Sequence, residues 1–150
     1  MRRWAAAVLI LSAWVAAGCS DHEFEPPDRA ERVARAATAF SVAMFDTVEW
    51  AGEADQLSAG NAVYSEACRR CHGQLGQGGT DYARQRDLTV PSLVNPEWPL
   101  AQVDSLRRKI FIGHESGMPV FGDGGLTPRE IDATAAYILR ELRPDVLEQD

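Results

Sequence analysis

Apolar residues recur every three to four positions along several stretches of the chain, with polar residues between them, which is the spacing of one buried helix face. Neighbouring cap residues and prolines indicate where each stretch begins and ends. The helices predicted in this way cover residues 29–45, 58–71, 104–113 and 128–143. The pattern therefore predicts an all-α fold.

The first and last of these helices have the clearest patterns. In helix 29–45 the apolar face consists of Val33, Ala37, Phe40 and Met44, and we expect this face to pack against the rest of the domain rather than against a partner. The last helix starts with Thr127 as N-cap, Pro128 at its first position and Glu130 completing a capping box. Pro144 is expected to end that helix after Arg143, and residues 46–57 are expected to be irregular.

Helix 58–71, for which Ser58 is the predicted N-cap, ends in Cys68-Arg69-Arg70-Cys71-His72. Two thiols three positions apart on one helical turn can both reach the vinyl groups of one porphyrin, and the next residue presents its imidazole to the iron. We therefore predict that Cys68 and Cys71 are thioether anchors of haem c and that His72 is the proximal iron ligand. The alternatives are a redox-active dithiol, which would need a preceding strand, and a zinc site, which would need a second ligand pair.

Met118 lies in a Gly-Met-Pro turn, where a methionine has little to pack against in a purely structural role. Its soft thioether is a good ligand for haem iron, so Met118 is the predicted sixth ligand. His114 is the main alternative, because an imidazole also ligates haem iron. Trp50 and Trp98 are candidates for the haem edge, but ordinary packing of a half-buried tryptophan is the favoured interpretation.

Several ordered motifs surround the pentapeptide and extend this interpretation to residues 58–143. They are Gly60 and Tyr64 before the motif, Gly73 after it, Gly113, Gly117-Met118-Pro119-Val120-Phe121, and Ala136-Tyr137-Ile138. In this order they resemble a class I cytochrome c. The resemblance implies one covalent haem, first and last helices that cross at Gly60, Met118 as the distal ligand, and Pro91 as the residue whose carbonyl orients His72.

The N-terminus has the pattern of an export signal. A basic start at residues 1–3 and an apolar run over 4–15 are followed by small residues and then Cys19, as at the end of a bacterial lipobox. Lipidation of Cys19 would also account for the odd thiol among three cysteines, since haem would use two. Simple signal-peptidase cleavage is the alternative. We expect a protein on the periplasmic side of a bacterial membrane, held there by a lipid anchor.

The sequence therefore divides into four predicted regions. They are a signal peptide at 1–19, a tether with an amphipathic helix at 20–57, a haem domain at 58–143 and a tail at 144–150. The chain has 15 basic and 22 acidic residues, and no basic arm that would indicate nucleic-acid binding.

The function expected from these features is single-electron transfer by a periplasmic, membrane-tethered cytochrome with one haem. Its partners would be a redox protein or a membrane oxidoreductase or oxidase. With His72 and Met118 on the iron, no coordination position stays open for a substrate, so we do not expect an enzyme. One alternative is a haem subunit of a larger membrane-associated oxidoreductase complex. Another is a haem enzyme or sensor with a labile sixth ligand.

Overall fold

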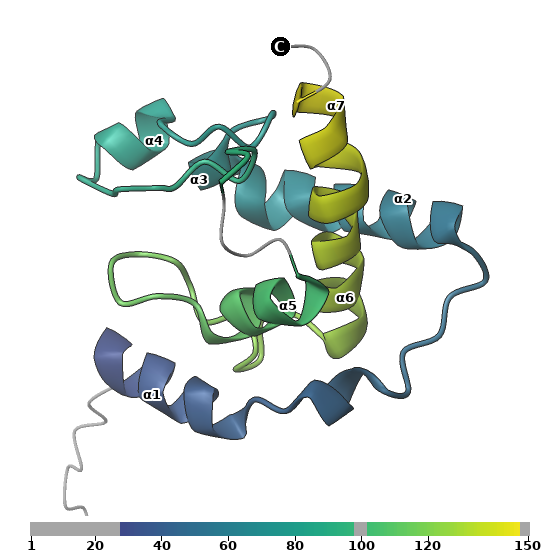
Figure 1. Ribbon diagram of the computed structural model, residues 1–150. Coiled ribbons are helices and arrows are strands. Elements are labelled where there is room, and N and C mark those ends of the chain that lie inside the picture. The colour runs from purple at the N-terminus through teal and green to yellow at the C-terminus, as the bar shows by residue number, and fades with distance from the viewer. Residues whose placement is uncertain (1–27, 98–101, 148–150) are drawn as a thin grey trace, which may run out of the picture.

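A computed structural model describes residues 28–97 and 102–147, which form helices and loops and no β-strand (Figure 1). The α-helices are α1 (Arg29–Ala39), α2 (Glu53–Val63), α3 (Arg69–His72), α4 (Asp81–Arg84), α5 (Val103–Ile112), α6 (Pro128–Tyr137) and α7 (Arg143–Leu147). Three shorter elements join them: the 3-10 turn η1 (Val42–Phe45) and the π-helical turns η2 (Tyr64–Cys68) and η3 (Ile138–Leu142). The prediction of an all-α fold is confirmed.

Helices α2 and α6 cross at Gly60. A Cβ atom at Gly60 would lie 2.1 Å from the carbonyl oxygen of Ala133 and 2.6 Å from Cβ of Tyr137, so no larger residue fits without moving one helix. One turn further on, the rings of Tyr64 and Tyr137 pack at a centroid distance of 5.5 Å. The expected crossing of the first and last helices of the haem domain is therefore confirmed, and it brings the C-terminal end of α2 beside the buried face of α6.

The capping box at the start of α6 is present as predicted. The Thr127 hydroxyl accepts the Glu130 N–H at 3.3 Å, and the Glu130 carboxylate accepts the Thr127 N–H at 2.8 Å. The predicted end of this helix is wrong, because the chain stays helical through η3 and α7 to Leu147. Arg143 keeps helical φ and ψ of −69° and −50° directly after the π-helical turn η3, and the helix continues past Pro144 although the proline has no N–H to donate.

The predicted helix 29–45 is two elements rather than one. Phe40 has an extended backbone that ends α1, and the Ser41 side chain accepts the Ala43 N–H at 3.3 Å to start η1. Serine competes for local backbone donors in this way, which explains the break. The predicted apolar face does pack against the core of the domain, through Val33, Ala37, Phe40 and Met44.

Helix α2 begins at Glu53, five residues before the predicted N-cap at Ser58. Its N-cap is Gly52, which has no capping side chain, so the sequence carries no cap signal there. Glu53 and Asp55 lie in the first turn, where negative charge is favourable. Part of the segment predicted to be irregular is therefore helical.

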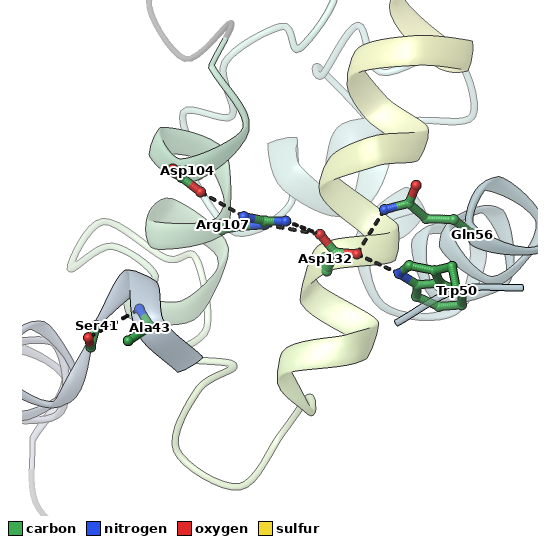
Figure 2. Close-up of polar contacts among 7 residues, drawn as sticks. All are labelled: Ser41, Ala43, Trp50, Gln56, Asp104, Arg107 and Asp132. Atoms are coloured by element: carbon green, nitrogen blue, oxygen red, sulfur yellow. Dashed lines mark hydrogen bonds and ion pairs between the residues drawn. The ribbon is translucent and has the colours of Figure 1, made fainter. Parts of the chain in front are cut away.

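A buried carboxylate connects the segment before α2 with α5 and α6 (Figure 2). Asp132 on α6 is 2% exposed and accepts hydrogen bonds from Nε1 of Trp50 at 2.7 Å and Nε2 of Gln56 at 2.8 Å. Arg107 on α5 pairs with the other carboxylate oxygen, donating from Nε at 3.0 Å, and also donates to Asp104 at 2.7 Å. This network fixes α5 against α6, and α5 forms part of the wall of the cavity described next.

Candidate haem-binding site

A cavity of about 480 Å³ lies between the segments that carry the predicted site residues, and its volume is in the range of ligand pockets. In Figure 1, α3 and α4 lie above this region, while α5 and the loop that follows it lie below. The predicted residues that line the cavity are Cys68, Cys71, His72, Pro91 and Met118, and the alternative ligand His114 lines it as well. The fold therefore gathers, around one space, residues up to 50 positions apart in the chain.

The backbone of the C-x-x-C-H turn is held by side chains from outside it. The buried Tyr64 hydroxyl donates to the Gly73 carbonyl at 2.7 Å, immediately after His72. Thr80 donates from its hydroxyl to the Arg70 carbonyl at 2.8 Å. These bonds satisfy carbonyls at the end of the short helix α3, and so they fix the backbone from which the His72 side chain projects.

The surroundings of the His72 imidazole suit a metal ligand. Burial lowers the pKa of His72, and the nearby Pro91 carbonyl raises it in part. The buried Nδ1 atom has no hydrogen-bond partner, so the Pro91 carbonyl falls short of hydrogen-bond geometry. A neutral imidazole is the form that binds metal, and a metal-ligating histidine commonly donates its other ring N–H to a carbonyl, which is the role expected of Pro91.

The two cysteines of the motif differ in exposure. Cys68 is buried and Cys71 is half-buried. Burial raises the pKa of the Cys68 thiol to about 12, and the neighbouring Cys71 adds to this. Redox-active C-x-x-C pairs instead lower the pKa of their nucleophilic thiol. The surroundings of Cys68 therefore suit an anchoring sulfur better than a dithiol catalyst.

Met118 lies on the loop of residues 113–127, which we call the Met118 loop. Gly113 ends α5 with a φ of +72°, and a Cβ atom there would lie 2.3 Å from the Pro119 carbonyl oxygen. Met118 is half-buried, and its carbonyl accepts the His114 N–H at 3.0 Å. The exposed His114 ring is engaged within its own turn, because its Nδ1 accepts the Ser116 N–H at 3.1 Å.

Sequence analysis missed several residues of the site. Tyr82 and Leu88 line the cavity from the region of α4, and Lys109 lines it from α5. The ring of Tyr82 also lies 3.9 Å from the guanidinium carbon of Arg86. The segment between residues 73 and 91 has no helical periodicity, and the one local signal is Thr80, which caps α4.

Trp50 lies away from the cavity, and its partners are Asp132 and the guanidinium of Arg129, whose carbon is 3.8 Å from the ring centroid. Packing, the favoured interpretation of this tryptophan, is confirmed. Trp98 and Cys19 lie outside the described residues. Within residues 28–97 and 102–147, no helix combines the length and the apolar character needed to cross a membrane.

A helical domain with a C-x-x-C-H turn and a methionine loop around one cavity has the architecture of a c-type cytochrome. Residues 55–138 match the family described as cytochrome c oxidase, cbb3-type, subunit III, and the chain belongs to this family. The protein is thus a c-type cytochrome, a class of haem proteins that transfer electrons. Comparison with curated proteins and comparison with solved structures each found no match.

Proposed function

We propose that the protein carries a single covalent haem c and transfers one electron at a time between redox partners. The observation that supports this proposal is the convergence of Cys68, Cys71, His72 and Met118 on one cavity. Two thiols, an imidazole and a thioether are the donor set of a haem held covalently with both axial positions filled.

Each residue has a distinct role in this proposal. The thiols of Cys68 and Cys71, which line the cavity, would hold the haem through thioether bonds to its two vinyl groups. The His72 imidazole and the Met118 sulfur would bind the iron, and the Pro91 carbonyl would orient His72. When bound, the haem supplies a one-electron Fe(III)/Fe(II) couple.

The apolar lining explains why the site favours electron transfer. Leu106 and Ile110 of α5 and Ile138 of η3 are buried and line the cavity, so they exclude water from the space around the iron. A thioether opposite an imidazole raises the reduction potential. With His72 and Met118 both bound to the iron, a substrate or gas would find no open site there.

The spectrum of the oxidised holoprotein tests this proposal. We expect the weak far-red charge-transfer band that belongs to sulfur-ligated ferric haem, together with haem that stays on the polypeptide after acid-acetone extraction. Extractable haem would contradict the thioether bonds. A high-spin spectrum without the far-red band would contradict methionine ligation and would favour the enzyme or sensor alternative.

Membership in an oxidase subunit III family favours a second candidate, a haem subunit within a membrane-associated oxidoreductase complex. In both cases the electron partner would be a redox protein or a membrane oxidase. Purification from native membranes in mild detergent distinguishes the two candidates. A carrier would elute alone, whereas a subunit would keep its membrane partners through successive columns.

The proposed location is the periplasmic side of a bacterial membrane, with a lipid on Cys19. The variant Cys19→Ser is expected to move the protein from the membrane fraction to the soluble periplasmic fraction, because lipid acylation would be its anchor. Fractionation and intact mass of both proteins measure this. A wild-type protein that is wholly soluble, or lacks the mass of the acyl chains, would exclude the anchor.

A further inference from the structure

Residues 29–52, which precede the family-matched region, are folded onto the domain. We call residues 29–52 the N-terminal extension. Its helix α1 contacts α5, and its turn η1 contacts α6. Ala36 and Phe45 are 3% and 6% exposed, so the extension has a buried face of its own. Figure 1 shows α1 running beneath α5 and beneath the Met118 loop.

An aromatic contact connects the extension to the Met118 loop. The ring of Phe40 packs edge-on against Phe111 of α5 at a centroid distance of 5.6 Å. Phe111 in turn contacts the loop in two ways. The Phe111 carbonyl accepts the Gly122 N–H at 2.9 Å. The Phe111 ring occupies the space that a Cβ atom on Gly122 would need. A shift of Phe40 would therefore reach the loop through a single intervening residue.

Two arginines of α1 reach the loop directly. Nη2 of Arg35 lies 2.8 Å from Oδ2 of Asp123. A Cβ atom at Gly117, the neighbour of Met118, would lie 3.6 Å from Nη1 of Arg29. The extension thus contacts the loop on both sides of Met118.

The loop itself has little internal structure to hold it. Its backbone hydrogen bonds form short turns, such as those from His114 N–H to the Met118 carbonyl and from Gly117 N–H to the His114 carbonyl. Its side chains Met118, Val120, Phe121 and Leu126 are partly buried against the core, so the loop is held mainly by contacts with the rest of the fold. External contacts therefore decide how often this loop opens.

We propose that the N-terminal extension is a brace that keeps the Met118 loop closed over the cavity. This inference rests on the proposed function, because the closed Met118 loop is what would hold the Met118 sulfur on the haem iron. Phe40 is the main positioning residue, acting through Phe111, and Arg35 is a weaker one. In an open loop the sulfur leaves the iron, and an external ligand binds in its place.

Imidazole titration of the ferric holoprotein tests the brace, with loss of the far-red band as the readout. Ligand affinity scales with the fraction of molecules whose loop is open, so Phe40→Ala should bind imidazole about tenfold more tightly than wild type. Arg35→Gln should tighten binding about twofold, because an exposed ion pair is weak.

Two matched controls separate bracing from general destabilisation. Trp50→Phe also lies in the extension and removes a buried hydrogen bond, but Trp50 is bonded to Asp132 and not to the loop. Arg140→Gln breaks an ion pair between Arg140 and Glu53. The Arg140 side chain is 54% exposed, the same fraction as the Arg35 side chain in its pair with Asp123. Both controls should keep the imidazole affinity of wild type.

Equal imidazole affinities of Phe40→Ala and Trp50→Phe, with the far-red band present in both, would overturn the brace and leave the proposed function intact. A wild-type protein without the band would overturn the proposed function, and the brace with it. If Phe40→Ala yields no holoprotein, the comparison of Arg35→Gln with Arg140→Gln decides the question, and equal affinities of that pair would overturn the brace.

Discussion

Met118→Ala is expected to abolish the far-red charge-transfer band of the oxidised protein while the haem stays covalently attached. The band requires sulfur on the ferric iron, and the cavity retains both cysteines and His72. The reduction potential is expected to fall by on the order of 100 mV or more, because axial ligation tunes it over several hundred millivolts. Absorption spectroscopy and redox titration measure the two effects.

Two further variants make this result specific. Met44→Ala removes the methionine of η1, which packs in the extension and does not line the cavity, so its band should remain. The double variant Met118→Ala with His114→Ala shows whether His114 replaces the lost ligand, since His114 is one of the residues that line the cavity. A low-spin spectrum in the single variant that becomes high-spin in the double variant would identify His114 as that replacement. A band retained in Met118→Ala would refute methionine ligation by this residue.

Asp132→Ala is expected to lower the free energy of unfolding by about 3–5 kcal/mol, because it leaves the Arg107 guanidinium without its buried partner. It also removes the acceptor for Trp50 and Gln56. Denaturant unfolding of the holoprotein, followed by circular dichroism, measures the loss. The control is Asp104→Ala, whose side chain is 50% exposed in its pair with the same arginine and should cost less than about 1 kcal/mol.

The same carboxylate predicts a pH dependence. Burial alone raises the pKa of Asp132, but hydrogen bonds from Arg107, Trp50 and Gln56 hold it below its ordinary value. The ionised form is therefore favoured in the folded state, and its stabilisation is present above the ordinary value of about 4 and is lost as the pH falls through the folded pKa. The stability difference between wild type and Asp132→Ala should shrink from neutral pH to about pH 2. A difference that stays constant over this range would show that Asp132 contributes by packing and not by charge.

The sequence by itself determined those features whose signals lie within a few residues. The C-x-x-C-H turn, the capping box of Thr127 and Glu130, and the end of α5 at Gly113 all arise from interactions inside one or two helical turns. These local signals were sufficient for the all-α fold and for the choice of Cys68, Cys71, His72 and Met118.

Tertiary structure decided the features whose partners are far apart in the chain. In the sequence, nothing distinguishes Asp132 from an ordinary surface residue. Only the packing of α6 places it beside Trp50 and Gln56, which lie 82 and 76 positions away in the chain. The start of α2 at Glu53, without a capping side chain, and the passage of the last helix through Pro144 likewise lack a local cap or stop signal. The approach of the N-terminal extension to the Met118 loop depends on a contact between Phe40 and Phe111 across the fold. Such contacts follow from the three-dimensional packing of whole helices, and short-range sequence patterns do not encode which distant side chains that packing brings together.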